Sequence, residues 1–363
     1  MKVLVVGPLP PPNGGMALQT EALVRQLRAE RVEVDVVAVN APYQPAWIGK
    51  LPVLRAGFRL LPYLWRLWRA AGRADLVHIL ANSGWSWFLF AVPAITIADW
   101  RRKAVVLNYR GGLAGEFFAR AFSKVQRSLR RCDDLIVPTA FLQTLFQQYQ
   151  QPAAIVPNIV DTELFAPRGE RPGEFHIVVT RNLEALYDNA AAIRALALLR
   201  QHYPDARLTL AGEGPERANL QQLAAQLGVA EAVHFAGRLP REQVAALLQT
   251  ARVVLNPSTA DNSPNSLIEA MAAGVPIVST EVGGVPQLCQ PDVHALLVPA
   301  RQPEAMAAAL ERVHSDDALR TRLIAAGRAR AAEFSWPAVW PALQASYARA
   351  RQRRSRRRSQ RDA

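Results

Sequence analysis

The sequence contains few cysteines and no long apolar run. Its two cysteines, Cys132 and Cys289, lie far apart in a chain of 363 residues, which argues against a disulfide framework and favours a reduced interior. The longest apolar stretch, residues 85–98, is too short to span a bilayer as a helix and contains Pro93. The opening residues Met-Lys-Val-Leu-Val-Val-Gly predict a buried strand rather than a signal peptide. We therefore expect a cytoplasmic protein without a transmembrane segment.

Several catalytic motifs are also missing. The six histidines show no metal-ligand spacing and Asp-x-Asp does not occur, so the sequence gives no support for a metal or another cofactor. The absence of Gly-x-Gly-x-x-Gly argues against a dinucleotide-dependent enzyme. Neither Ser-x-x-Lys nor Gly-x-Ser-x-Gly is present, so these serine-nucleophile signatures are excluded.

Acidic residues are scarce relative to basic ones, and the formal net charge is +13. Residues 351–363 contain seven arginines and one aspartate, which accounts for six of the thirteen excess charges. This segment has almost no apolar residues, so we expect a disordered tail. Such a tail favours contact with anionic lipid. Nonspecific nucleic-acid binding is the alternative, but no pattern of stacking aromatics accompanies the arginines, and we expect no specific nucleic-acid partner.

The rest of the chain alternates apolar runs with amphipathic segments, which predicts an α/β protein with parallel sheets. A proline-rich connection at residues 157–173 separates two such series. We therefore expect two Rossmann-like domains, residues 1–165 and 170–333, with a returning helix at 334–350. The expected strands are 2–6, 33–39, 75–80, 104–108, 134–137, 153–156, 175–180, 207–211, 232–236, 252–256, 276–279 and 295–298. The expected helices are 15–29, 54–71, 85–99, 116–130, 139–149, 188–201, 215–227, 241–249, 264–273, 284–289 and 303–332.

The segment 253–280 is the most informative part of the second series. It predicts a strand, a polar loop, a short helix and another strand, with Pro264 in the first turn of the helix and Gly274 at its end. Ser263 or Asn262 is expected to cap this helix. A helix start at the end of a parallel strand offers N–H groups to a phosphate. Carboxylates at 261 and 269, close to such a site, indicate a ligand with both phosphates and hydroxyls, such as a nucleotide-sugar.

These residues resemble the retaining glycosyltransferases of the GT-B fold. That family carries a Glu-x7-Glu motif, then Ala-Met-Ala-x-Gly-x-Pro-x-Val and a Gly-Gly pair. The matching positions here are Asp261, Glu269, Ala270-Met271-Ala272, Gly274, Pro276, Val278 and Gly283-Gly284. The segments Pro11–Gly15, Pro157–Asp161, Ala211–Pro215 and Phe334–Trp336 also match in order. The resemblance covers about residues 1–350. It implies two Rossmann-like domains facing across a cleft, with a C-terminal helix crossing back to the first domain.

The resemblance also implies the site residues. The helix start at Asn265, Ser266 and Leu267 would bind the donor phosphates, together with Gly14, Gly15 and Gly237. Glu269 suits a vicinal diol such as a ribose, and Asp261 would bind sugar hydroxyls or balance positive charge at the anomeric carbon. Arg181 would neutralise the leaving diphosphate. The structural alternatives are a helix-dipole glutamate, a turn-forming aspartate and a loop arginine.

The sequence departs from the family at three places. Asp261 stands where the family usually has glutamate. The usual Arg-x-x-x-x-Lys pair keeps only Arg181, with Tyr187 or Asp188 near the place of the lysine. A histidine often found near the fourth strand is also missing, and Arg110 lies there instead. We expect Arg110 to serve the same pocket and to restore the lost positive charge.

The helix expected at 54–71 supports two interpretations. Its residues Leu54, Phe58, Leu61, Trp65 and Trp68 form one apolar stripe, with four arginines beside it. A basic, tryptophan-bearing helix can lie on an anionic membrane surface, or the stripe can face a protein core. The run Gly84–Phe90 can likewise line a path for a lipid acceptor or pack internally.

Together these features predict a retaining glycosyltransferase of the hexosyltransferase type. It would move a sugar from a nucleotide-sugar to a saccharide or lipid-linked acceptor in cell-surface polysaccharide biosynthesis. The place would be the cytoplasm, on the inner face of the membrane. One alternative is an enzyme related to nucleotide-sugar epimerases, although the expected site lacks the carboxylates and histidines that such an enzyme needs. The other is a noncatalytic nucleotide-sugar-binding subunit of a polysaccharide assembly.

Overall fold

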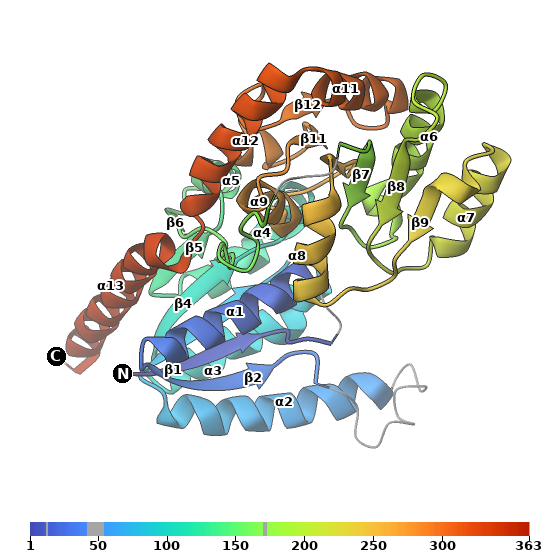
Figure 1. Cartoon of the computed structure of the whole chain (residues 1–363). Coiled ribbons are helices and arrows are strands. Elements are labelled where there is room, and N and C mark those ends of the chain that lie inside the picture. Colours follow the sequence, from blue (N-terminus) through green and yellow to red (C-terminus); the bar gives the residue numbers. More distant parts are fainter. Residues whose placement is uncertain (12–13, 42–53, 170–172, 363) are drawn as a thin grey trace. The chain divides into compact units, whose positions relative to one another are not determined.

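The computed structural model describes residues 1–11, 14–41, 54–169 and 173–362. The chain forms two compact units, Met1–Ile159 with Val339–Ala363, and Val160–Ala338 (Figure 1). Each unit contains one parallel six-stranded sheet. The expectation of two parallel α/β sheets is therefore confirmed.

The first unit has the strand order β2-β1-β3-β4-β5-β6. Most of its strand residues are apolar and buried, because helices cover both faces of the sheet. Helix α1 lies on one face, and α2 and α3 lie on the other (Figure 1). The elements are β1 (Lys2–Gly7), α1 (Gly15–Ala29), β2 (Glu33–Ala38), α2 (Leu54–Arg73), β3 (Leu76–Ala81), the π-helix η2 (Trp87–Ala91), α3 (Val92–Trp100), β4 (Ala104–Tyr109), α4 (Ala114–Leu129), β5 (Asp134–Val137), α5 (Ala140–Gln148) and β6 (Ala154–Ile155).

The second unit has the order β12-β11-β10-β7-β8-β9. Alternate residues of β7 point into two separate cores: Ile177 and Val179 pack with α6, α7 and α11, and Val178 packs with α8 and α9. The elements are β7 (His176–Val179), the 3₁₀ helix η3 (Ala185–Tyr187), α6 (Asn189–Leu199), β8 (Arg207–Leu210), α7 (Arg217–Gln226), η4 (Ala230–Ala232), β9 (Val233–Phe235), α8 (Arg241–Thr250), β10 (Val253–Asn256), α9 (Asn265–Ala272), β11 (Ile277–Thr280), α10 (Val285–Leu288), β12 (Leu296–Val298), α11 (Pro303–Ser315) and α12 (Asp317–Ala332). The last helix, α13 (Trp336–Asp362), begins in this unit and belongs to the first unit from Val339 onward.

The single helix expected at 303–332 is wrong, because the structure has two helices there. Asp316 leaves the helical conformation, with φ of −100° and ψ of 97°. Its carboxylate accepts a hydrogen bond of 2.8 Å from the N–H of Leu319 and so caps α12. The apolar period continues across this break, so periodicity alone does not reveal it.

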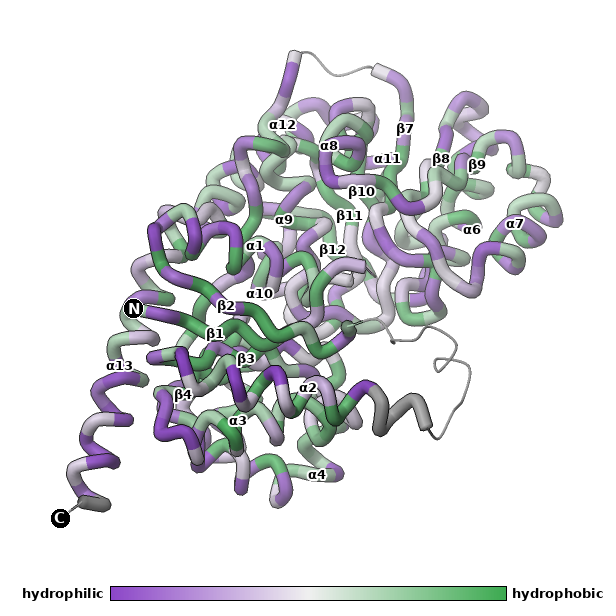
Figure 2. Tube along the Cα trace, turned by 90° about the horizontal axis from the view of Figure 1, so that it is seen from below, coloured by the Kyte–Doolittle hydropathy of each residue, from purple (hydrophilic) through white to green (hydrophobic). Residues whose placement is uncertain are grey.

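Of the two interpretations of the stripe with Leu61, Trp65 and Trp68 on α2, the core-facing one is wrong, because another stripe of the helix packs into the core. Tyr63, Leu67 and Ala71 are buried against the sheet, whereas Trp65 and Trp68 are 61% and 44% exposed. The two stripes are neighbours on the helix, because apolar residues occur in consecutive pairs such as Leu64-Trp65 and Leu67-Trp68. Both stripes have helical spacing, so the sequence cannot say which one is buried. Hydrophobic and hydrophilic segments alternate along α2 in Figure 2.

The expectation of a disordered tail is also wrong. Residues 351–362 continue α13 as a helix, and from Val339 onward this helix belongs to the first unit. Arg354 is almost completely buried. Its guanidinium forms ion pairs of 2.7 Å with Asp99 and 2.8 Å with Asp133. The carboxylate of Asp133 also accepts a hydrogen bond of 2.9 Å from the N–H of Val105.

Further arginines of α13 hold the same end of the sheet. The Asp134 carboxylate pairs with Arg349 at 2.9 Å and with Arg353 at 3.3 Å, and it accepts a hydrogen bond of 2.7 Å from Ser346. Arg357 donates to main-chain carbonyls that follow α4, including that of Cys132 at 3.2 Å. The tail is ordered because its arginines form ion pairs with buried carboxylates and donate hydrogen bonds to the main-chain carbonyls that follow α4. We call Arg349, Arg353, Arg354 and Arg357 with Asp99, Asp133 and Asp134 the arginine clamp.

Among the described helices, none has a stretch that is both long and apolar enough to cross a bilayer. Cys132 and Cys289 are both buried free thiols. Burial raises the pKa of the Cys289 thiol to about 12, so this group is held in its unreactive protonated form.

Candidate functional site

In the second unit, the sequence-predicted residues gather where the order of the strands reverses. Strands β8 and β9 follow β7 to one side of it, and β10 lies on the other side. Such a switch point, at the carboxyl ends of the strands, is where open α/β sheets bind their ligands. Arg181 follows β7 directly, and the loop that contains Asp261 connects β10 to α9.

Glycines allow the two segments of this site to pack closely on neighbouring turns. A Cβ atom at Gly212 would lie 2.1 Å from the carbonyl oxygen of Arg181. Likewise, a Cβ at Gly283 would lie 2.0 Å from the carbonyl oxygen of Asp261, and the N–H of Gly284 donates to this oxygen at 3.0 Å. Side chains at these positions would push the site loops out of place. This explains the Gly-Glu-Gly and Gly-Gly pieces of the sequence pattern.

The Arg181 guanidinium is the centre of the assembled site. It forms an ion pair with Asp261 and donates a weaker hydrogen bond of 3.4 Å to Ser266 Oγ. Burial raises the pKa of the Asp261 carboxyl, against the opposing effect of Arg181. The Nε of Arg181 and the Oγ1 of Thr180 are buried without a hydrogen-bond partner among the described residues. Two unused polar groups at one strand end are available to an incoming anion.

Tyr187 contacts the same arginine from another side. Its ring lies 4.2 Å from the Arg181 guanidinium carbon, in a cation–π contact. Asp188 has a different role, because it caps α6 by accepting a hydrogen bond of 3.3 Å from the N–H of Ala191. Tyr187 is therefore the residue that takes up the space beside Arg181.

Glu269 lies in the second turn of α9 and is half-buried. No side chain in the described part of the chain hydrogen-bonds to its carboxylate. Burial raises the pKa of Glu269 from its usual 4.5 to about 7, although the positive charges of Arg241 and Arg181 oppose the shift. Arg241, at the start of α8, was not among the sequence-predicted residues, because nothing near it in the sequence marks a site.

The start of α9 agrees only partly with expectation. The N-cap position is Pro264, and no side chain caps it. Ser266 contacts Arg181, as described above. Leu267 is fully buried, and its N–H already donates to the carbonyl of Pro264 at 3.1 Å. The main-chain N–H of Leu267 is therefore engaged within the protein.

Gly237 follows β9 with φ of 69°, a backbone conformation that favours glycine. Its conformation alone accounts for the residue type. Asn265 is the first residue of α9 and is half-buried.

The first unit contributes Gly14 and Gly15 at the start of α1. Gly14 is the N-cap residue, and its carbonyl accepts the N–H of Leu18 at 3.0 Å. A Cβ atom at either glycine would meet no atom within 4 Å. The described fold therefore does not need glycine here for space, so open room remains above the helix start.

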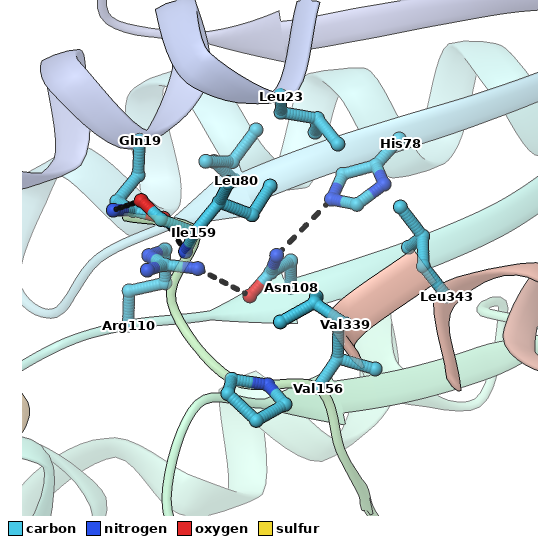
Figure 3. Close-up of a pocket in the computed structure, with 11 residues that line it drawn as sticks. Gln19, Leu23, His78, Leu80, Asn108, Arg110, Val156, Ile159, Val339 and Leu343 are labelled. Carbon is cyan, nitrogen blue, oxygen red and sulfur yellow. Dashed lines mark hydrogen bonds between the residues drawn. The ribbon is translucent and has the colours of Figure 1, made fainter. Parts of the chain in front are cut away.

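Arg110 lies in a pocket of the first unit (Figure 3). Its guanidinium donates to Asn158 and, at 3.3 Å, to the side chain of Asn108. Asn108 hydrogen-bonds to His78 at 3.1 Å, and His78 to Tyr347 at 2.9 Å. Burial lowers the pKa of His78 to about 3 and that of Arg110 to about 10. This chain of hydrogen-bonded groups joins β3, β4 and α13, and through Arg110 it extends to Asn158, close to the point where the chain leaves the first unit.

No group of three histidine, cysteine or carboxylate side chains within residues 1–11, 14–41, 54–169 and 173–362 has the arrangement of a metal site. The expectation of a metal-independent protein stays a prediction.

Comparison with known structures identifies the architecture. HepE from Anabaena superposes with a TM-score of 0.73 at 18% identity, covering 96% of this chain and 100% of that one. Sucrose-phosphate synthase from Thermosynechococcus elongatus gives a TM-score of 0.71 at 19% identity, covering 95% and 97%. These similarities confirm the expected GT-B fold.

Comparison of sequences decides the family. The profile of the glycosyl transferases group 1 matches residues 160–330, and that of glycosyltransferase family 4 matches residues 13–164. The MMP alpha-(1->4)-mannosyltransferase of Mycolicibacterium hassiacum is 30% identical over 320 residues, which cover 87% of this chain and 70% of that protein. The chain belongs to the group 1 glycosyltransferases.

Another similar glycosyltransferase matches over a shorter length. The D-inositol 3-phosphate glycosyltransferase of Corynebacterium urealyticum is 30% identical over 234 residues. This match spans 58% of our chain and about half, 55%, of that relative. The group 1 profile includes Arg181, Asp261 and Glu269, so the cluster at the β7–β10 switch point lies within the part of the chain that defines the family.

Proposed function

We propose that the protein is a retaining glycosyltransferase of the hexosyltransferase type. It transfers a sugar from a nucleotide-sugar to a saccharide or lipid-linked acceptor of cell-surface polysaccharide biosynthesis, on the cytoplasmic side of the membrane. The observation that carries the proposal is the Arg181 cluster: a cation with an unused Nε at the strand switch point, in contact with Asp261 and Ser266. The anion that suits this position is a diphosphate.

The candidate site residues of the second unit have the following roles in the proposed donor complex. Arg181 and the N-terminal turn of α9 balance the charge of the diphosphate as it leaves. The half-buried carboxylate of Glu269 accepts hydrogen bonds from the ribose hydroxyls, and Asp261 faces the sugar. Arg241 supplies the second positive charge near this carboxylate, in place of the missing lysine. No metal is needed in this scheme.

The first unit binds the acceptor in this proposal, and Gly14 and Gly15 approach the donor phosphates. The acceptor hydroxyl attacks the anomeric carbon on the face from which the diphosphate departs. The new glycosidic bond forms as the bond between sugar and phosphate breaks, and the leaving phosphate takes the proton of the hydroxyl. No side chain is required as a base. Arg110 binds Asn158, in the segment where the chain leaves the first unit, and adds positive charge to this unit's part of the proposed site.

A screen of nucleotides tests the proposal. Relatives of the fold have been crystallised with UDP and with UDP-glucose, so uridine, guanosine and adenosine diphosphate sugars are the first compounds. The correct donor at 100 times its Kd is expected to stabilise the fold by about 2.7 kcal/mol, measured as a rise in Tm. The anomeric proton coupling of the product, measured by NMR, then reports retention or inversion.

The outcomes separate the competing functions. A nucleotide-sugar that binds but is never transferred or altered would indicate a noncatalytic subunit. Conversion of the donor to its sugar epimer without an acceptor would indicate an epimerase-like enzyme. An inverted product would contradict the retaining mechanism.

Glu269→Gln is expected to stabilise the ligand-free protein at high pH. Because burial raises the pKa of Glu269 to about 7, the folded state keeps a proton between about pH 4.5 and 7 that the unfolded state has lost. Stability therefore falls as pH rises through this window. Removing the titration should raise the free energy of unfolding by about 1–3 kcal/mol at pH 8 and leave it unchanged near pH 4. Urea unfolding at both pH values measures the difference.

The exposed carboxylate of Glu231 in the same unit provides the matched control, since Glu231→Gln should change neither free energy of unfolding.

Glu269 should also govern the pH dependence of ligand affinity. Hydrogen bonds from ribose hydroxyls favour its charged form, so nucleotide affinity of the unaltered protein should rise from pH 5.5 to pH 8. Equal pH dependence in Glu269→Gln would contradict the ribose role.

A further inference from the structure

Several tryptophan side chains are exposed on α2 and on the helical segment that ends in α3. On α2, Leu61, Trp65 and Trp68 are exposed although another stripe of the same helix packs into the core. On the neighbouring helical segment, Trp85 and Trp100 are 80% and 68% exposed. Large aromatic side chains that remain in water at several adjacent places mark an interaction surface.

The two helices form one continuous surface. They lie on the same face of the first sheet (Figure 1). The hydroxyl of Tyr63 on α2 donates to the carbonyl of Phe90 at 2.7 Å, near the start of the second helix. At the other end, the Arg101 guanidinium lies 4.1 Å from the ring of Trp68 and donates to its carbonyl at 3.3 Å. These contacts hold α2 against the helical segment that carries Trp85 and Trp100.

The charge of this surface has one sign. Helix α2 contains no acidic residue. Arg66, Arg69 and Arg73 are exposed, and none of them forms an ion pair with a carboxylate that the structure describes. Arg69 instead lies 5.5 Å from the ring of Trp65. The acidic residue at the end of α3, Asp99, is already paired with Arg354.

We propose that this tryptophan–arginine face, formed by Leu61, Trp65, Arg66, Trp68, Arg69 and Arg73 of α2 with Trp85 and Trp100, docks on an anionic lipid bilayer. Indole rings partition into the interface between lipid headgroups and acyl chains, while the arginines contact acidic headgroups. Two copies of the chain would bring like charges together if this face met itself, which disfavours a symmetric dimer. The arginine clamp is not part of the docking surface, because its charges are engaged inside the first unit.

Vesicle flotation with the full chain tests the proposal. The unaltered protein should float with vesicles of equal parts phosphatidylglycerol and phosphatidylcholine and remain below with phosphatidylcholine alone. One arginine near such a surface contributes about fivefold in partitioning, so Arg66→Glu with Arg73→Glu should weaken binding at least about 25-fold. Trp65→Ser with Trp100→Ser should weaken binding to the same vesicles and reduce the fraction that stays bound in high salt.

Two exposed arginines of α13 supply the matched control. Arg351→Glu with Arg356→Glu makes the same change in net charge on another surface and should leave flotation nearly unchanged. Circular dichroism of every variant verifies folding. Equal loss in the control and test variants would overturn the proposal, as would binding to phosphatidylcholine alone at the same strength. A dimer in sedimentation that the test variants abolish would assign this face to self-association instead. No sugar transfer is measured, so the result is independent of the proposed enzyme activity.

Discussion

An Arg181→Ala variant is expected to lower kcat about 10²–10³-fold, with a small change in KM for the donor. In the proposed mechanism the guanidinium would interact most strongly with the diphosphate when the bond to the sugar is breaking, because negative charge on the leaving group is then greatest. An interaction that strengthens in the transition state changes kcat more than KM. Initial rates with the donor found by thermal shift measure both constants. Arg181→Lys keeps the charge without the planar fork and should recover part of the loss.

The ion pair with Asp261 requires a second variant for this experiment. Both side chains are nearly buried, at 13% and 12% exposure, so removing the arginine alone leaves a carboxylate without its partner and lowers stability. The double variant Arg181→Ala with Asp261→Asn should regain stability but not transfer. Activity of the single variant within about tenfold of the unaltered enzyme would contradict the role of Arg181 in leaving-group stabilisation.

Arg354→Ala is expected to lower the free energy of unfolding by up to about 3–5 kcal/mol, because it removes the closest partner of the buried Asp133 carboxylate and leaves Arg357, at 3.2 Å, to balance its charge. Asp133 is completely buried, and Arg354 is its 2.8 Å partner. The loss should appear in urea unfolding of the first unit, followed by circular dichroism. Arg356, two residues further along the same helix, is exposed, and Arg356→Ala should change stability by less than about 0.5 kcal/mol.

A similar small effect for both variants would show that the arginine clamp contributes little. Asp133→Asn combined with Arg354→Ala removes both charges at the same loss of side-chain packing and so distinguishes the remaining possibilities. If the clamp acts through charge pairing, this double variant should be more stable than Arg354→Ala alone. If it is not, the packing of the Arg354 side chain is what matters.

Local patterns were sufficient to predict most of the fold. Buried parallel strands are short apolar runs bounded by polar turns, so no strand limit differs from expectation by more than one residue. Besides the break at Asp316, two differences concern helices whose order or buried side depends on partners elsewhere in the chain. The tail is helical because its arginines bond to Asp133 and Asp134. These partners lie more than 200 positions earlier in the chain, so no property of residues 351–362 reveals them. In α2, two apolar stripes compete, and only the packed sheet selects between them.

The candidate site was predictable to a similar extent. Motif spacing identified Arg181, Asp261 and Glu269, and the first two are in direct contact. The contact of Tyr187 with Arg181 could not be predicted, because the direction of an aromatic side chain in a loop depends on its neighbours. Arg241 was missed for another reason: its positive charge acts on Glu269 from α8, a helix with no motif of its own. The buried amide of Leu267 shows that a helix start does not by itself leave every N–H free.

The arginine clamp also has a consequence for the order of events during synthesis. Asp134 and Arg349 are separated by 215 residues, so a ribosome adding about 5–20 residues per second needs about 10–40 s to pass from one to the other. Once β6 has been made, early in that interval, the first sheet has all its strands but not its basic partners, and the whole of the second unit is still to be made. The first part of the chain to emerge is therefore the last to be completed, and it depends on chaperones or on its own residual stability until the final helix arrives.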